Sequence, residues 1–357
     1  MSPRLGTTGS SNPEYVNARV RARKAALFDD EDYRKLVRMG PSEIARFMEE
    51  TEYETEINAL GSRFSGVDLI EYALHRNLAK HFDDLLDFSE GRLYELIARY
   101  LRKFDAWNVK TVIRGIYAGA DREAIQTDLI RAGEFDDRLL DRLVDAGSIE
   151  EVIEVLDGTI FGDALEDAYE EYEDLGTLVP LENAIDRVFY DRMLSGLTTH
   201  RVERDNPMAM YVEFLQAEID FRNVRNALRV AHSGADIDPA EFFIEGGTLF
   251  TPQELSQFVG DPDALVTRIE ESRYGDRLSQ ALEQLREAES LIGFEHALDA
   301  ALLEYSDRLS NVHPTSITSV LAYILAKEKE VENIRAIARG REVGLSEEEI
   351  ERELVIL

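Results

Sequence analysis

The stretch NVKTVIRGIYAG, residues 108–119, decides the fold class of this chain of 357 residues because it is written three times. Its other two versions are NVRNALRVAHSG at 223–234 and NIRAIARGREVG at 333–344. In each version an Arg follows the Asn by six residues and a Gly follows that Arg by five. Counted from the Asn, positions +1, +4 and +5 are apolar and share one face of an α-helix. Each stretch therefore predicts an amphipathic helix that packs on a core and ends at its Gly.

Two further marks recur in the same order along the chain. The phrase apolar–Glu–x–Ala–apolar–Asp/His stands at 70–75, 181–186 and 294–299. A Gly precedes a short helical segment at Gly40, Gly147 and Gly260. Three ordered marks in three copies identify an internal repeat. The polar residues that mark it are Glu71, Glu182, Glu295, Asn108, Asn223 and Asn333.

Helical spacing of apolar residues dominates the rest of the chain, and strand-like alternation is scarce. We therefore predict an all-α fold. The marks divide the chain into a polar tail at 1–14, a first repeat with its leading helix at 15–146, a second at 147–259 and a third at 260–357. The third repeat is truncated, because it stops soon after Gly344 whereas the other two continue through a further segment.

The charge composition narrows the class of partner. Asp and Glu number 72 against 40 Lys and Arg, which gives a formal net charge of −32. Nucleic acid and anionic membrane surfaces attract positive charge, so neither is expected as a partner. Only 7 of the basic residues are Lys, and the combination predicts a cytosolic protein of a salt-loving organism. The chain has no Cys, and none of its apolar runs approaches the ~20 residues of a membrane span.

Basic residues occupy positions +2 and +6 of every repeated helix. They are Lys110, Arg114, Arg225, Arg229, Arg335 and Arg339. Like charges at this spacing repel, so each pair calls for negative counterparts. One interpretation is a salt bridge within each repeat, with Glu71, Glu182 and Glu295 as candidates. The other is a set of basic pairs that bind an acidic partner.

The recurrent Asn and an acid three residues before it have a structural interpretation. We expect the Asn to be a half-buried amide that satisfies a backbone group of a neighbouring helix. The acids are Asp105, Asp220 and Glu330, and they lie near the apolar face. Because burying a lone carboxylate is costly, each needs a partner that the sequence does not identify.

Signatures of enzymes are missing from the sequence. It contains no H-E-x-x-H, phosphate-binding loop, G-x-G-x-x-G or G-x-S-x-G pattern. Its recurrent polar residues are spread over three repeats, whereas catalysis gathers unlike groups in one pocket. We therefore expect a non-enzyme, with no catalytic, cofactor-binding or metal-binding residue.

Several phrases in order resemble one known family. The repeated phrases, including RYLRKFDAWNVKTVIRG at 99–115 and FLQAEIDFRNVRNALR at 214–229, are similar to the C subunit of the archaeal A-type ATP synthase, the equivalent of the d subunit of the vacuolar ATPase. The resemblance implies a funnel of three similar helical domains around a pseudo-threefold axis. It also implies a non-catalytic adaptor of the central stalk, on the cytoplasmic face of the membrane and in one copy per complex. There it would couple the shaft, made of the D and F subunits, to the proteolipid ring during proton- or sodium-driven ATP synthesis or hydrolysis. The alternative from the residues alone is a general helical scaffold with an unrelated partner.

Overall fold

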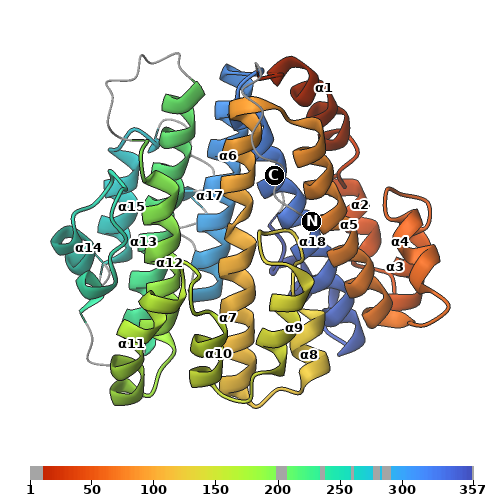
Figure 1. Ribbon diagram of the computed structural model, residues 1–357. Coiled ribbons are helices and arrows are strands. Elements are labelled where there is room, and N and C mark those ends of the chain that lie inside the picture. Colours follow the sequence, from red (N-terminus) through yellow and green to blue (C-terminus); the bar gives the residue numbers. More distant parts are fainter. Residues whose placement is uncertain are drawn as a thin grey trace. The chain divides into compact units, whose positions relative to one another are not determined.

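The structure is a computed structural model that describes residues 11–197, 207–233, 238–258, 261–275, 282–283 and 291–355. Regular structure within these ranges is helical throughout, with no strand, which confirms the all-α prediction (Figure 1). The described residues form two compact units. The first draws on Met1–Leu101, Thr127–Gly133 and Leu309–Leu357, and the second on Arg102–Gln126 and Glu134–Arg308. The division into three repeats stays a prediction.

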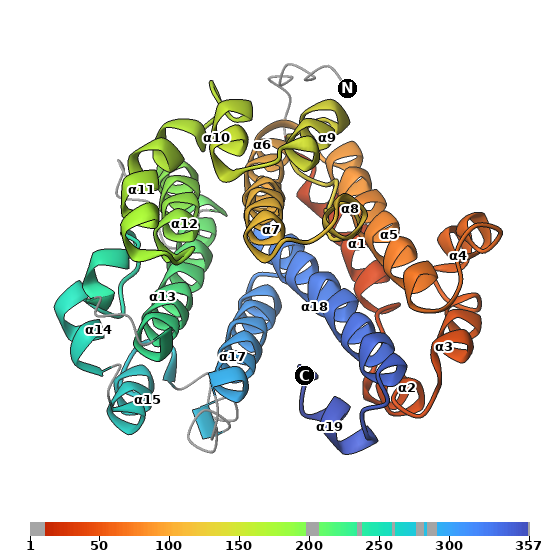
Figure 2. The same cartoon turned by 90° about the horizontal axis from the view of Figure 1, so that it is seen from below.

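The first unit joins the two ends of the chain. Its long C-terminal helix α18 packs against five helices from the N-terminal part of the sequence (Figure 2). Ile334 and Ile337 of α18 are fully buried there, and each such side chain contributes about 1.5–3 kcal/mol. The helices of this unit are α1 (Pro13–Lys24), α2 (Asp30–Leu36), α3 (Pro41–Met48), α4 (Glu54–Leu60), α5 (Gly66–Phe88), α6 (Gly91–Leu101), α18 (Ile317–Glu342) and α19 (Glu347–Glu351).

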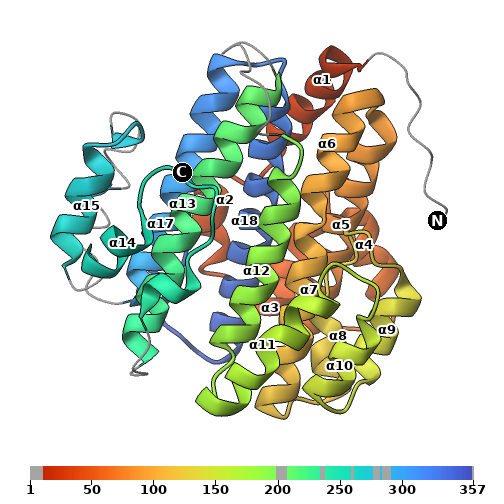
Figure 3. The ribbon, with the colours of Figure 1, turned by 60° about the vertical axis from the view of Figure 1, so that its left-hand side comes forward.

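The second unit is built around α12, which packs against α7, α11 and α13 (Figure 3). Its elements are α7 (Lys103–Ala118), α8 (Arg122–Thr127), α9 (Asp137–Asp145), α10 (Ile149–Val155), α11 (Gly162–Leu175), α12 (Val179–Leu194), α13 (Pro207–Ser233), η1 (Pro239–Phe242), α14 (Pro252–Phe258), α15 (Pro262–Glu270) and α17 (Leu291–Val312). The last residue of α8 and the last turn of α17 fall within the ranges of the first unit.

The three repeated stretches lie on α7, α13 and α18, as their apolar spacing predicts. Positions +1, +4 and +5 are buried in all three helices. Gly119 and Gly344 follow their helices with φ of 67° and 81°, in the left-handed region that favours glycine. Gly234, which ends the second stretch, and Gly260 lie outside the described residues.

Across the described ranges, no helix combines the length and the apolar character that crossing a membrane requires. No group of three or more His, Asp and Glu side chains among them could hold a metal ion.

Candidate functional site

The basic pair of α7 forms a first ion-pair cluster with two acids of α12. Lys110 Nζ donates to Asp186 Oδ1 at 2.6 Å. Arg114 makes a bidentate contact with Glu182, through Nε at 2.5 Å and Nη2 at 2.8 Å. Burial lowers the pKa of Lys110, and it opposes the ionisation of Asp186 as well. The positive charges of Lys110 and Arg222 outweigh burial at Asp186, so the pKa of Asp186 is lowered and its carboxylate stays charged.

The second ion-pair cluster repeats this arrangement between α13 and α17. Arg229 binds both oxygens of Glu295, through Nε at 2.5 Å and Nη2 at 2.7 Å. Arg225 pairs with Asp299 one turn further along. Burial raises the pKa of Glu295, but the hydrogen bonds and charge of Arg229 overcome that effect, and the pKa is lowered overall. Both clusters therefore hold two helices together by four charges.

The third ion-pair cluster, between α18 and α5, differs at one position. Arg339 pairs with Glu71, but the residue at the position of Asp186 and Asp299 is His75, which forms a hydrogen bond with Arg335. Burial, followed by the charge of Arg335, lowers the pKa of His75 to about 3, so His75 is neutral at physiological pH. The remaining negative charge comes from Asp128, which lies 3.8 Å from Arg335 Nη1 and 3.4 Å from Arg339 Nη2.

The pairing follows one rule in all three clusters. The Arg at position +6 of each basic pair forms a salt bridge with the recurrent Glu of the following repeat. The Arg of the third repeat does so with the Glu of the first. The candidates Glu71, Glu182 and Glu295 are confirmed as counterparts. The expectation of bridges within one repeat is wrong, because spacing along the chain does not determine which neighbouring helix a side chain faces. The side chains of Arg114, Arg229 and Arg339 remain 42%, 41% and 51% exposed, so partner binding by the six basic residues stays a prediction.

The recurrent Asn is a structural residue in the two repeats where its hydrogen bonds are described. Asn223 donates to Ile244 O at 2.9 Å and accepts from Ile244 N at 2.7 Å. Asn333 makes the same two bonds with Val355, at 2.9 and 3.0 Å. The partner is the backbone of a non-helical segment rather than the neighbouring helix that we expected. Asn108, Asn223 and Asn333 are all fully or almost fully buried, not half-buried.

The recurrent acid accepts hydrogen bonds from backbone N–H groups in every repeat. In the first two repeats the donors are two successive residues, separated from the repeated helix by one short helix. They are Glu134 and Phe135 for Asp105, and Thr248 and Leu249 for Asp220. In the third repeated stretch the donor lies far upstream in the sequence, because Glu330 accepts from Phe28 N at 2.6 Å.

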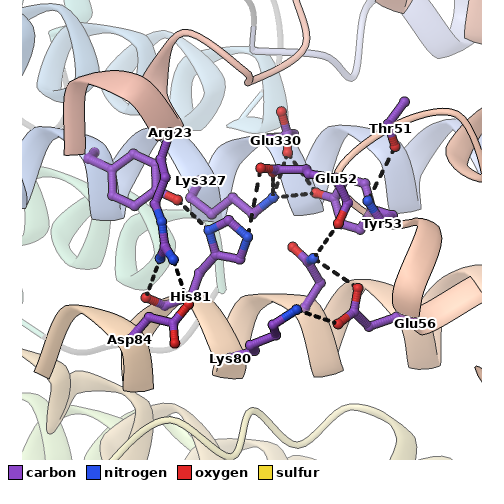
Figure 4. A network of polar contacts seen from close by, with 12 residues as sticks. Arg23, Thr51, Glu52, Tyr53, Glu56, Lys80, His81, Asp84, Lys327 and Glu330 are labelled. Atoms are coloured by element: carbon purple, nitrogen blue, oxygen red, sulfur yellow. Dashed lines mark hydrogen bonds and ion pairs between the residues drawn. The ribbon is translucent and has the colours of Figure 1, made fainter. Parts of the chain in front are cut away.

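Glu330 also belongs to a buried polar network around Lys327 (Figure 4). Lys327 is completely buried, and its Nζ lies 2.9 Å from both Glu330 Oε1 and Tyr53 OH and also pairs with Glu52. Tyr53 OH donates to Glu330 Oε1 at 2.6 Å, and the ammonium group lies 4.2 Å from the centre of the Tyr53 ring. A buried ammonium needs this density of partners, because an unpaired one would cost several kcal/mol.

The network continues to α1 through His81. Its Nδ1 lies 2.5 Å from Tyr323 OH, and its backbone carbonyl accepts from Arg23 Nη1 at 3.2 Å. Burial and the charge of Lys327 lower the pKa of His81 to about 3, so this ring is neutral. The sequence patterns did not point to Lys327, Glu52 or His81. The available signal was Glu330, an acid near an apolar face that needed a partner.

The buried Asp105 gives a prediction for pH dependence. Burial raises its pKa from 3.8 to about 6, although two backbone N–H groups oppose the shift. Between pH 3.8 and about pH 6, the folded state therefore holds a proton that the unfolded state has lost. The resulting stabilisation is full below pH 3.8 and is lost as the pH rises through about 6. Asp105→Asn removes this dependence. Relative to wild type, we expect the unfolding free energy of the variant to rise by about 2.4 kcal/mol from about pH 4 to about pH 7.

Denaturant titrations of both proteins across this range measure the difference. Asp191→Asn, at an exposed position of α12, is the control and should give a difference that changes by no more than about 0.5 kcal/mol. A flat difference for Asp105→Asn as well would show that Asp105 is ionised throughout.

Comparison with known proteins identifies the family. Residues 16–353 match the family model described as ATP synthase (C/AC39) subunit. A protein of Haloferax volcanii that is named as the C subunit of A-type ATP synthase is 69% identical, over 99% of this chain and 100% of the relative. Proteins with the same name from Halobacterium salinarum and Methanococcoides burtonii are 59% and 37% identical, over 99% and 97% of this chain and 100% and 95% of the relatives. The first two organisms are haloarchaea, in keeping with the salt-loving source inferred from composition. The chain therefore belongs to the ATP synthase (C/AC39) subunit family.

Proposed function

We propose that this member of the family is the non-catalytic adaptor of the central stalk in an A-type ATP synthase. It couples the shaft, made of the D and F subunits, to the proteolipid ring, in one copy per complex, on the cytoplasmic face of the membrane. The observation that carries the proposal is the match over residues 16–353, together with relatives that bear the name of the C subunit and align along their whole length. Catalysis is left to other subunits, and ATP synthesis or hydrolysis depends on this chain only through the transmission of rotation.

Stiffness is the property that supports a mechanical role. A part that transmits torque must resist shear between its helices. The bidentate Arg–Glu contacts of the first two clusters join helices that are far apart in sequence, Arg114 to Glu182 and Arg229 to Glu295. Two parallel hydrogen bonds fix the relative orientation of the two groups as well as their distance. The repeated clusters are thus suited to keep packed helices from sliding.

Affinity purification of the tagged chain from salt-grown cells tests the proposal. We expect the D and F subunits to be recovered with it, and we expect the proteolipid ring when membranes are extracted gently in high salt. Cross-linking before extraction should give contacts of this chain with both the shaft and the ring. Recovery of a stable complex that lacks every other part of the ATP synthase would support the general helical scaffold with an unrelated partner instead.

The exposed arginines of the three clusters allow partner binding and internal support to be separated. If they bind the shaft or the ring, Arg114→Ala, Arg229→Ala and Arg339→Ala together should weaken association at least tenfold, while a folded protein remains. Association is measured by titration of the purified chain with the D–F pair in concentrated potassium chloride, and folding by circular dichroism. Each exposed ion pair contributes only about 0–1 kcal/mol, so the fold should survive.

The matched control removes three exposed arginines outside the clusters, Arg46, Arg138 and Arg142. It loses the same charge and should bind as wild type does. If the cluster variant melts much earlier than the control and its folded fraction binds normally, the three substituted arginines have only an internal role.

A further inference from the structure

A small pocket in the second unit has four cationic side chains among the ten residues that line it. It lies against α7, α12, η1 and α13, beside the first ion-pair cluster, and its volume is about 40 Å³. This volume has room for one or two species of the size of a water molecule. The charged residues on its wall are Lys110, Arg114, Arg222, Arg229, Glu182 and Asp186.

The balance of charge at this pocket is positive in a chain whose net charge is −32. Four cations face two carboxylates on the wall. Arg229 is matched by Glu295, outside the wall, which leaves Lys110, Arg114 and Arg222 against the two carboxylates. Glu218, a further carboxylate near Arg222, lies 4.0 Å from Lys103 and is matched by it.

The hydrogen bonds of the two carboxylates also indicate an excess of positive charge at the pocket. Glu182 directs both oxygens to Arg114. Asp186 directs Oδ1 to Lys110 and has Arg222 4.0 Å from Oδ2. Arg114 and Arg229 both line the pocket, and each bidentate contact engages only two of the five N–H groups of a guanidinium. The side-chain amide of Asn226 also lines it.

We propose that this pocket binds a small inorganic anion of the size of chloride. The anion balances the positive charge that the two carboxylates leave, and it accepts hydrogen bonds from guanidinium groups that otherwise repel one another. Because the ion would bind the folded chain and not the unfolded one, it stabilises the fold in proportion to its concentration. The proposal does not rest on the role in the rotor, although Arg114 and Arg229 belong both to this pocket and to the residues tested there for partner binding.

Crystals of the full-length chain in potassium bromide test the proposal directly. We expect an anomalous bromide peak inside the pocket, within hydrogen-bonding distance of at least one guanidinium. Solution melting is the second measurement. At equal potassium concentration, the melting temperature should be about 2–4 °C higher in chloride than in glutamate, an anion too large for the pocket. A bromide map with no peak in the pocket overturns the proposal.

Asn226→Asp is the matched variant, because it places a carboxylate in the pocket with almost no change of shape. We expect the bromide peak and the stabilisation by chloride relative to glutamate to disappear together. Asn58→Asp, at an exposed position of α4, adds the same charge and should keep both. If chloride stabilises the Asn226→Asp variant as much as wild type, the ion acts elsewhere and the proposal fails.

Discussion

Replacing Lys327 by Met is expected to destabilise the protein by about 3–5 kcal/mol, the effect of breaking a buried salt bridge from one side. The substitution conserves the volume of the side chain but leaves Glu52 and Glu330 without their cation. Lys327 is completely buried and Glu330 is 2% exposed, so water cannot replace the contact between these two residues. Denaturant unfolding in potassium chloride at several concentrations measures the loss, which salt should hardly change because ions do not screen a buried pair.

Two further variants test the cause. Lys327→Met with Glu330→Gln removes one of the stranded charges and should recover part of the loss. Lys35→Met changes a lysine whose side chain is 46% exposed and pairs with Glu31, so it should cost no more than about 1 kcal/mol. If Lys327→Met is as mild as Lys35→Met, the two carboxylates are protonated or hydrated in the folded protein, and the network does not depend on the ammonium group.

Asp220→Ala is the second substitution with a large expected effect, about 4 kcal/mol of destabilisation. Asp220 Oδ1 accepts from Thr248 N at 2.7 Å and Leu249 N at 2.9 Å, and Oδ2 accepts from Tyr274 OH at 2.6 Å. Alanine leaves these buried donors without a partner, at about 1–3 kcal/mol each. Thermal and denaturant unfolding of the purified variant measure the effect.

Asp220→Asn separates hydrogen bonding from charge. The amide oxygen still accepts from Thr248 N and Leu249 N, so the loss should be at least about 2 kcal/mol smaller than for alanine. Asp191→Ala removes an exposed carboxylate of α12 and should change stability by no more than about 0.5 kcal/mol. Equal losses for the alanine and asparagine variants would mean that the charge of Asp220, and not its hydrogen bonds, stabilises the 248–249 segment.

The fold class and the repeated helices could be predicted because their signal is local. A face of apolar residues at helical spacing reports directly which side of α7, α13 and α18 is buried. The sequence also predicted that each basic pair has acidic counterparts, because like charges four residues apart on a helix repel. The recurrence of Glu71, Glu182 and Glu295 identified them as the acidic counterparts. It did not show that each of them pairs with a basic residue of another repeat.

The buried network around Lys327 could not be predicted, because its members are far apart in sequence. Lys327 and Glu52 are separated by 275 residues, and nothing local in either segment indicates the other. A weak signal exists in composition. The chain has 7 Lys among its 40 basic residues, and two of those seven, Lys110 and Lys327, are buried in polar clusters. At these two positions the site is confined, and a compact ammonium fits it better than a planar guanidinium.

The contact of Glu330 with Phe28 N has a consequence for synthesis on the ribosome. The chain emerges from its N-terminus at roughly 5–20 residues per second, so the beginning of the first unit waits about 15–60 s for α18. During that interval the second unit, which lies between the two parts, has time to fold. The apolar faces of α1, α3 and α5 meanwhile lack the helix that covers them, and in a crowded cell they are the surfaces that a chaperone would be expected to protect.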